Sequence, residues 1–407
     1  MSDQASSAKA KRIKVCYVHH SGVWGGASTS LYTLLRNLDH EKYTTTVITP
    51  TGSVVDRFSR VTDKVVEVST DAMPGVIPSL AGDRLVPLKT FIRSIVSGRV
   101  WNRVWTHIAN IDPDLVHLNE VSLLPLAYMC HLAKIPCVLH ARCRPKGSGT
   151  LLDKIAQHFI NRWNVSVICI SESVSLGYTH VLRQRTIRNP LQFNSVESVD
   201  AYRMKTTPFR VLFLSNFIRY KGIEEVIDAA VSLSGETDIQ FLFAGRNPRD
   251  HRFYRSRLGR LLHRLKLYVN YERRLSDLAS SSTITNITYL GQVDDIAGLL
   301  DSVHVLLAPM HLDAPPRSIF EAAARGVPSI LSLDSAVRDA TIHNESGLVI
   351  PPKRPDVLAA AILRLKESRD TVITLGNNAL NTLTNMHDPH NTTRRVELLY
   401  TEILQET

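Results

Sequence analysis

The feature of the sequence that most constrains the fold is a repeated alternation of short apolar strands with amphipathic helices. The alternation runs through the first half of the chain and starts again near residue 209. Helices that link consecutive strands favour parallel sheets that are covered on both faces. Two such series in 407 residues predict two doubly wound Rossmann-like domains of the α/β class.

The two series share the same order of elements. The first opens with a predicted strand, IKVCYVHH (13–20), and a glycine-rich turn, SGVWGGAS (21–28). A helix over 29–38 and strands over 43–50, 65–68, 115–118, 137–140 and 167–170 are expected to follow. In the second series we expect a strand over 209–217, a helix over 221–233, a strand over 239–247 and, near the end, a helix over 355–368.

The domain boundaries follow from these two series. We expect a polar tail over 1–12, a first domain over 13–190, a linker over 191–208, a second domain over 209–384 and a C-terminal helix over 385–407 that crosses back to the first domain. In doubly wound sheets, ligands bind beyond the carboxyl ends of the strands. A ligand shared by two such sheets is therefore expected in a cleft that the two domains face.

Several features of the sequence indicate a cytoplasmic protein. The five cysteines (Cys16, Cys130, Cys137, Cys143 and Cys169) are odd in number and show no CxxC spacing, which is typical of reduced thiols. No apolar run approaches the roughly 20 residues that a membrane span needs. The polar first residues lack the apolar core of a secretory signal.

The net charge of +10 suggests an anionic partner. The candidates are phosphorylated small molecules, an anionic membrane surface and nucleic acid, and the alternative is a basic surface without a specific partner. The chain has no zinc-finger spacing, no aromatic RNA-binding motif and no heptad-linked basic region. We therefore expect no nucleic-acid partner.

Two predicted strand ends carry residues suited to a phosphate group. Gly22, Gly25 and Gly26 follow the first strand and permit close approach of an anion to a helix N-terminus, although the GxGxxG spacing is absent. In the second half, Arg219 and Lys221 stand at the start of a helix, where cations suit a diphosphate. A plain strand–helix turn and a solvent-exposed basic turn are the respective alternatives.

Two further segments of the first half are candidate sites. Asp112 and Asp114 form an Asp-x-Asp pair that suits a divalent metal, but they precede a strand, so a strand-entry turn is favoured and no metal site is expected. His140 and Arg142 end the strand in IPCVLHARCRPKG (135–147), where the cluster of cations fits an anion or a sugar as well as it fits a structural role.

The segment HLDAPPRSIFEAAARGVPSIL (311–331) predicts a rigid loop, a short helix and a buried strand. Ser318 and Glu321 have capping-box spacing at the expected start of this helix. Asp313 and Glu321 lie eight residues apart, so that both carboxylates can accept hydrogen bonds from sugar or ribose hydroxyls. The alternative for Glu321 is that it only caps its own helix.

Together these segments resemble the retaining glycosyltransferases of family four, which have the GT-B architecture. The resemblance spans nearly the whole chain and is strongest over 209–352. There the strand–lysine–glycine–helix unit, FAGRNP, YLGQVDDIAGLLDSVHVLLAPM, SIFEAAARGVPSILS and ESGLVIPP occur in the family's order. The resemblance implies a nucleotide-sugar donor (UDP-, GDP- or ADP-linked) in the second domain, an acceptor in the first, and no metal or other cofactor.

The resemblance also implies roles for individual residues. Lys221 looks like the diphosphate lysine, Glu321 like the acid on the ribose, and Gly25 and Gly26 like the loop that approaches the phosphates. Further donor-binding positions are Gly245, at the end of a strand, and the peptide N–H groups near Ser318 and Ile319.

Three positions depart from the family pattern. The first acid is Asp313 rather than glutamate, and Asn216 stands where an arginine is usual, so Arg219 or Arg317 is expected to supply the missing cation. The register of the usual catalytic histidine falls on Arg142, with His140 two residues earlier, and both are candidates.

The expected function is therefore transfer of a hexose-like sugar to a glycan, polysaccharide or lipid-linked acceptor. A catalytically silent nucleotide-sugar-binding protein and a sugar-nucleotide epimerase are the alternatives. Two basic stretches, 86–108 with its tryptophans and 246–274, either rest on an anionic membrane as a peripheral contact or form ordinary helices with solvated faces.

Overall fold

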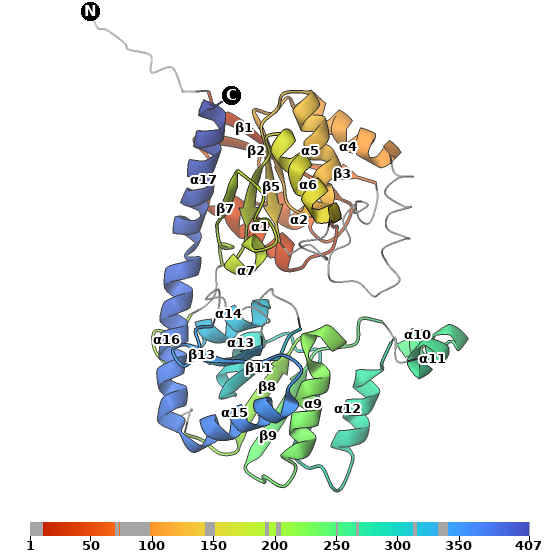
Figure 1. The fold of residues 1–407 in the computed structure, drawn as a ribbon, viewed down its shortest axis with the longest axis vertical. Coiled ribbons are helices and arrows are strands. Elements are labelled where there is room, and N and C mark those ends of the chain that lie inside the picture. The colour runs from red at the N-terminus through yellow and green to blue at the C-terminus, as the bar shows by residue number, and fades with distance from the viewer. Residues whose placement is uncertain are drawn as a thin grey trace, which may run out of the picture. The chain divides into compact units, whose positions relative to one another are not determined.

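The structure is a computed structural model, and it describes residues 11–69, 73, 98–142, 151–191, 195–200, 205–249, 251–265, 268–311, 316–332 and 341–406. The chain divides into two compact units (Figure 1). Unit 1 comprises Met1–Gln192 together with His387–Thr407, and unit 2 comprises Phe193–Met386.

Unit 1 is built on a seven-stranded sheet with the order β3-β2-β1-β4-β5-β6-β7, in which every pair of neighbours is parallel. The strands are β1 (Ile13–Val18), β2 (Tyr43–Pro50), β3 (Lys64–Val68), β4 (Leu115–Leu118), β5 (Cys137–Ala141), β6 (Ser166–Cys169) and β7 (Gln184–Thr186). The helices of this unit are α1 (Gly26–Asn37), α2 (Val55–Phe58), α4 (Gly98–Ile111), the 3₁₀ turn η1 (Val121–Leu123), α5 (Leu124–Leu132), α6 (Leu151–Arg162), α7 (Glu172–Ser175) and α17 (Pro389–Gln405).

Unit 2 is built on a six-stranded parallel sheet with the order β10-β9-β8-β11-β12-β13. Its strands are β8 (Phe209–Leu214), β9 (Ile239–Ala244), β10 (Ile287–Gly291), β11 (Val305–Ala308), β12 (Ser329–Ser332) and β13 (Gly347–Ile350). Its helices are the 3₁₀ turn η2 (Arg219–Lys221), α9 (Ile223–Ser232), α10 (His251–Arg255), α11 (Arg257–Arg264), α12 (Tyr271–Ala279), α13 (Ile296–Asp301), α14 (Arg317–Ala324), α15 (Pro355–Glu367) and α16 (Arg369–His387).

Apolar side chains on both faces of each sheet explain the doubly wound form. In β1, Cys16 and Val18 contribute to one core cluster, whereas Val15 and Tyr17 contribute to another. Because successive side chains of a strand point to opposite faces, this segment needs a layer of helices on each side. The predicted fold class, with two doubly wound Rossmann-like domains, is confirmed.

The last helix completes unit 1. Val396, Leu399 and Ile403 of α17 are buried in the same cluster as Val15 and Tyr17. The Tyr400 hydroxyl donates to the hydroxyl of Tyr17 at 3.2 Å. Hence the C-terminal end of the chain packs against strands from its first half.

The helix α4 packs on its own sheet rather than presenting its tryptophans to solvent. Trp101 is buried in the core of unit 1, and Trp105 packs against that core from a partly buried position. Within the basic stretch 86–108, residues 98–108 therefore form an ordinary packed helix. Residues 86–97 lie outside the described residues. Across the described parts of the chain, no helix is both long and apolar enough to span a membrane.

Two local expectations were wrong. The strand β7 was not predicted, since QRT has neither an apolar run nor a clear alternation. The helix α14 begins at Arg317, one residue earlier than predicted, with Pro316 as its N-cap and no side-chain cap hydrogen bond. The capping box predicted at Ser318 is therefore absent, because Ser318 already lies within the helix and its side chain is buried.

Candidate functional site

The strand order of unit 2 places its candidate site beyond β8 and β11. These two strands are neighbours, and the order of the sheet reverses between them. In doubly wound sheets the crevice at such a reversal is the usual ligand site, because the loops from the two strands leave in opposite directions. Lys221 follows β8, and the segment that leads to α14 follows β11.

Gly222 fixes the position of Lys221. Its φ of 83° lies in the left-handed region, and a Cβ at this position would overlap the carbonyl oxygen of Pro309. The backbone N–H of His311 also donates to the carbonyl of Tyr220 at 2.9 Å. The turn that carries Lys221 is thus held against the loop beyond β11, and only glycine permits so close an approach.

Lys221 is a partly buried cation that is available to an anion. Burial lowers the pKa of its ammonium group below the ordinary value. Its Nζ lies 5.6 Å from the centre of the Tyr220 ring. Among the described residues no carboxylate pairs with Lys221. Its positive charge is therefore available to bind an anionic ligand.

The two arginines expected to assist Lys221 are each paired with a carboxylate. Arg219 Nε lies 2.8 Å from Glu224 Oε2, and its side chain is mostly exposed. Arg317 Nε donates to Glu321 Oε1 at 2.8 Å, across one turn of α14. The charge of each arginine is therefore offset locally, whereas that of Lys221 is not.

The start of α14 supplies backbone donors at the same edge of the sheet. The N-cap residue, Pro316, makes no side-chain cap hydrogen bond, and the described residues place no polar side chain on the first N–H groups. The N–H of Ile319 donates to the carbonyl of Pro316 at 3.1 Å, and the side chains of Ser318 and Ile319 are buried. Asp313, the predicted first acid, lies outside the described residues.

Gly245 joins the ends of neighbouring strands in unit 2. Its N–H donates to the carbonyl of Gly291 at 2.7 Å, and its φ is 144°. A Cβ there would overlap the carbonyl oxygen of Ser215, which places the end of β9 against the end of β8. Asn216, at which the resemblance leads us to expect an arginine, is exposed at this edge.

A histidine–glutamate pair beside Lys221 was missed at the sequence level. Glu225 lies in the first turn of α9, 8% exposed, and its Oε1 is 2.7 Å from Nε2 of His311. The other carboxylate oxygen of Glu225 is buried and has no hydrogen-bond partner among the described residues. A histidine just beyond an apolar strand, in VLLAPMH, was the available signal.

In unit 1 the sheet reverses between β1 and β4. Gly25 ends the loop that follows β1, and Gly26 is the first residue of α1. Both are exposed, and Gly25 is the N-cap of α1 with an extended backbone. A Cβ on either would meet no atom of the described residues within 4 Å. Packing among the described residues therefore requires neither glycine, and the space beside them suits a ligand.

Arg142 stands just beyond the end of β5 in a network of amides. Its guanidinium donates to the side-chain oxygen of Asn119 at 3.1 Å and to that of Asn189 at 2.8 Å. Asn119 also contacts the ring of His19 at 2.8 Å. Burial lowers the pKa of Arg142 to about 10, which leaves the side chain charged at neutral pH.

His140 lies inside β5, behind Arg142. Its Nδ1 is 3.1 Å from Nε2 of His117, and its Nε2 is buried without a partner among the described residues. Burial lowers the pKa of His140, and the nearby Arg142 charge adds to this effect, so the ring is neutral. His140 is thus a residue of β5, whereas Arg142 follows the last residue of that strand, Ala141.

Several polar residues at the strand ends of unit 1 were not expected from the sequence. None of His19, His20, His117, Asn119 and Asn189 was predicted as a site residue. In the structure His19 and Asn119 are fully buried and hydrogen-bonded at the carboxyl ends of β1 and β4. Two consecutive histidines after an apolar strand were the signal that could have found them.

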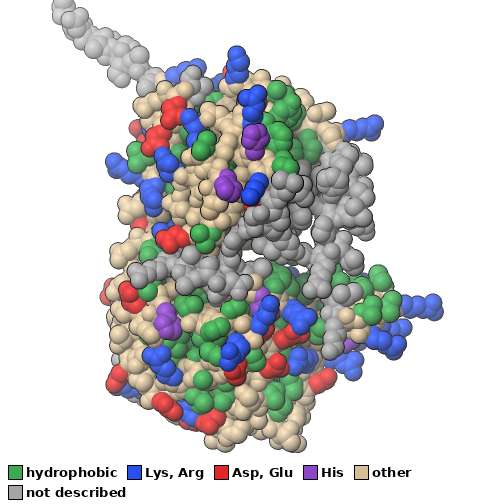
Figure 2. Space-filling model, viewed as in Figure 1, with side chains coloured by type: hydrophobic (Ala, Val, Ile, Leu, Met, Phe, Trp, Pro, Cys, Tyr) green, Lys and Arg blue, Asp and Glu red, His purple; other side chains and the backbone are tan. Residues whose placement is uncertain are grey.

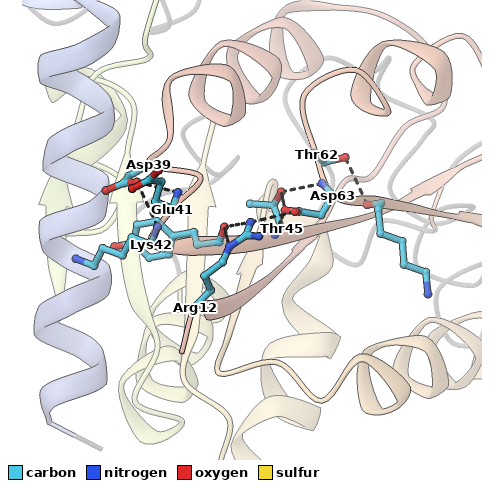
Figure 3. A network of polar contacts seen from close by, with 9 residues as sticks. Arg12, Asp39, Glu41, Lys42, Thr45, Thr62 and Asp63 are labelled. Atoms are coloured by element: carbon cyan, nitrogen blue, oxygen red, sulfur yellow. Dashed lines mark hydrogen bonds and ion pairs between the residues drawn. The ribbon is translucent and has the colours of Figure 1, made fainter. Parts of the chain in front are cut away.

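The opposite edge of unit 1 does not belong to this site. A cavity of about 950 Å³ lies there, lined among others by Arg12, Lys14 and Lys64. Figure 3 shows a polar network that includes the lining residue Arg12, which donates to Asp63, and the N–H of Thr45 donates to the same carboxylate. These contacts join the amino ends of β1, β2 and β3.

Asp112 and Asp114 lie at that amino edge as well. The carboxylate of Asp114 accepts from the N–H of Lys14 at 2.7 Å, and Asp112 lies 3.5 Å from Nζ of Lys14. The two acids therefore form a strand-entry turn, as favoured from the sequence. Nowhere in the described ranges do three metal-ligating side chains gather.

Two doubly wound parallel units, each with a cation at the reversal of its sheet, define the class of two-domain α/β proteins with Rossmann-like units. Comparison with known proteins specifies the class. Residues 24–176 match the family described as Glycosyltransferase Family 4, and residues 197–382 match Glycosyl transferases group 1. Between them the two matches take in most of the chain, and the protein belongs to these glycosyltransferases.

Individual relatives are distant. The D-rhamnosyltransferase WbpZ of Pseudomonas aeruginosa is 27% identical over 190 residues, which is 46% of this chain and 43% of that relative. The matched stretch thus spans less than half of the relative's length.

Solved structures share the fold over nearly the whole chain. Anabaena Alr3699/HepE, solved in complex with UDP, has a TM-score of 0.66 at 17% identity and covers 96% of this chain and 100% of its own. Sucrose-phosphate synthase from Thermosynechococcus elongatus has a TM-score of 0.66 at 18% identity and covers 97% of this chain and 100% of its own. The fold is therefore GT-B, as expected.

Proposed function

We propose that this protein is a retaining glycosyltransferase that moves a sugar from a nucleotide-sugar donor to a glycan, polysaccharide or lipid-linked acceptor. The observation that carries the proposal is Lys221, a partly buried ammonium without a carboxylate partner in the described structure, fixed where the sheet of unit 2 reverses. A diphosphate is the ligand that such a cation, beside an uncapped helix start, would stabilise best.

The chemistry of transfer explains why this cation matters. As the glycosidic bond breaks, positive charge develops on the sugar and negative charge on the departing diphosphate. A fixed ammonium attracts the diphosphate more strongly in this transition state than in the bound donor, because the negative charge on the diphosphate has grown. The ammonium therefore lowers the activation barrier in addition to tightening donor binding. We propose that Lys221 does this without a metal ion, and that the N–H groups at the start of α14 assist it.

The remaining donor contacts are assigned by position. Glu321 would accept from the ribose hydroxyls, which requires it to loosen its bond to Arg317. Asn216, Arg219 and Gly245 would border the diphosphate at the ends of β8 and β9, and Asp313 would contact the sugar. If Glu321 turns to the ribose, Arg317 is released to act as a second cation.

The donor is proposed to be a UDP-, GDP- or ADP-linked sugar, and UDP is the first to test. HepE was solved with UDP and with UDP-glucose, and the matched curated relative is a D-rhamnosyltransferase. In unit 1, Gly25 and Gly26 leave room for a ligand, and Arg142 presents a charged group for acceptor or donor oxygens. The four described cysteines are buried thiols, which supports a cytoplasmic setting for this activity.

The experiment that tests the proposal is thermal unfolding of the purified protein with UDP, GDP, ADP and their sugars, with EDTA present. We expect one nucleotide series to raise the melting temperature. With the donor known, NMR of the product's anomeric proton tests retention. An inverted anomeric configuration would refute the retaining mechanism. A strict requirement for a metal ion would refute the proposal that Lys221 stabilises the departing diphosphate without one.

A specific observation keeps a second function in view, namely nucleotide-sugar binding without turnover. Asn216 replaces the usual arginine, and both nearby arginines are neutralised by carboxylates. Such a protein would show the same thermal shift but neither transfer nor hydrolysis of the donor with any acceptor in the panel.

A further inference from the structure

The helix α11 carries an apolar stripe of leucines that are each more than half exposed. Leu258, Leu261 and Leu265 are 59%, 53% and 57% exposed. Their spacing of three and four residues places them on one face of the helix, and Leu265 is its C-cap residue. Single exposed leucines are common on protein surfaces. A row of three on one short helix indicates a surface that binds another protein or a membrane.

The opposite side of α11 is anchored, so the direction of the leucines is fixed. Gly259 packs so closely on α10 that a Cβ would overlap the carbonyl oxygen of Phe253. The N–H of Tyr268 donates to the carbonyl of Leu262 at 3.3 Å, and Nδ1 of His263 lies 3.1 Å from the carbonyl of Tyr268. Figure 1 shows α10 and α11 projecting from the side of unit 2.

A second stripe on α11 is positively charged. Arg257, Arg260 and Arg264 each precede one of the three leucines, so they form a parallel row about 100° around the helix. All three are exposed, and none has a carboxylate partner among the described residues. The sequence contains no acid between Asp250 and Glu272. Figure 2 shows cationic side chains beside hydrophobic ones on this projection.

We propose that the α10–α11 projection docks on an anionic lipid surface, with the leucines at the boundary of headgroups and acyl chains and the arginines on the headgroup phosphates. A short helix with leucines on one face and arginines beside them has the chemistry of an interfacial helix. The proposal concerns the surface on which the enzyme works and stands apart from glycosyl transfer itself.

Charge and apolar area together favour lipid over the other occupants. A second copy of this chain would bring a surface of the same positive charge against this one, which costs free energy in a symmetric contact. A polyanion such as nucleic acid would satisfy the arginines but leave the leucines in water. An anionic membrane satisfies both rows at once.

The test is flotation of the full chain with vesicles of phosphatidylcholine alone and of phosphatidylcholine mixed with phosphatidylglycerol. One variant replaces the apolar row (Leu258→Ser, Leu261→Ser, Leu265→Ser), and another neutralises the cationic row (Arg257→Gln, Arg260→Gln, Arg264→Gln). A matched control replaces three exposed leucines of unit 1 (Leu132→Ser, Leu182→Ser, Leu398→Ser), which are 65%, 84% and 54% exposed.

We expect the wild-type protein and the control to float with the anionic vesicles only, and less so as salt is added. The serine variant should lose at least about tenfold in partitioning, since each buried leucine contributes apolar area. The glutamine variant should lose a similar amount together with the dependence on phosphatidylglycerol. Donor-induced thermal shifts should be the same in all four proteins, so loss of docking is distinguishable from loss of the proposed catalytic function.

Three outcomes would overturn the proposal. One is no flotation of the wild type with either kind of vesicle. Another is equal flotation of the serine variant and the control, which would leave the leucines without a role. The third is a wild-type dimer that the serine variant breaks, without lipid binding, which would assign α11 to a contact between copies.

Discussion

Replacing Lys221 with alanine tests the proposed mechanism most directly. The change removes the one cation at the reversal of the unit 2 sheet for which the described structure shows no carboxylate partner. Losing one fixed group that stabilises a developing oxyanion lowers turnover by about 10²–10³-fold, or roughly 3–4 kcal/mol of barrier. We expect kcat to fall by this factor in Lys221→Ala.

The fold should survive the same substitution. Removing Lys221 leaves no orphaned carboxylate, since it pairs with none in the described residues. Because burial lowers its pKa, the charged side chain opposes folding slightly at neutral pH. The melting temperature of Lys221→Ala should therefore be equal to or higher than that of the wild type.

The pH dependence has a definite sign. Only the charged ammonium attracts the diphosphate, so donor affinity should fall as pH rises through the lowered pKa of Lys221, in a range below the ordinary lysine value. Binding of the donor in that range should be accompanied by proton uptake. Calorimetry in buffers of different ionisation enthalpy measures this directly.

The assay compares initial rates of transfer and melting temperatures for the wild type, Lys221→Ala and Lys64→Ala. Lys64 is a control because it is an exposed lysine at the amino edge of unit 1. A folded Lys221→Ala protein with wild-type turnover would refute the reasoning. An equal loss in Lys64→Ala would show that the effect is one of general charge.

Four further predictions concern other parts of the two units. Gly222→Ala should lower stability by about 1–3 kcal/mol and weaken donor binding, whereas Gly235→Ala, whose Cβ meets nothing within 4 Å, should do neither in urea unfolding and calorimetry. Glu321→Ala should weaken nucleotide affinity by about 10–100-fold, and unchanged affinity by calorimetry would exclude its ribose role. Arg142→Gln should slow transfer but leave nucleotide affinity intact, and a parallel loss of affinity would place its role at the donor instead. Burial lowers the pKa of His117 to about 3, so protonation of this ring favours the unfolded state. Between pH 7 and pH 5 this group should lower the free energy of unfolding by about 2 kcal/mol. In urea titrations, His117→Gln should lose about 2 kcal/mol less over this pH range than the wild type.

Much of the architecture was predictable because its signals are local. The segment YTTTVITP was predicted as a strand over 43–50, and β2 spans Tyr43–Pro50. The helix expected over 355–368 is α15, Pro355–Glu367, and begins with the proline that a first helical turn tolerates. Apolar periodicity and turn residues act over a few positions, so a single sequence displays them.

The candidate site was predictable only in part. That Lys221 and Gly222 follow a strand could be read from the sequence, but the overlap that a side chain at Gly222 would cause with Pro309 involves a residue 87 positions away. The pairs Arg219–Glu224 and Arg317–Glu321 join residues close in sequence, yet their formation depends on side-chain directions that periodicity does not give. The sequence therefore suggested three cations for the diphosphate, and the structure leaves Lys221 without a carboxylate among the described residues.

By itself, the sequence determined that the chain forms two α/β series with strands that end in glycines, histidines and cations. The tertiary structure decided that β1 adjoins β4 and that β8 adjoins β11, and these pairings bring the strand ends to two reversal points. It also decided that Tyr400 closes over Tyr17, and that His117 contacts His140. Such contacts depend on which strands pair and which faces pack between segments far apart in the sequence. Local residue patterns do not determine this pairing.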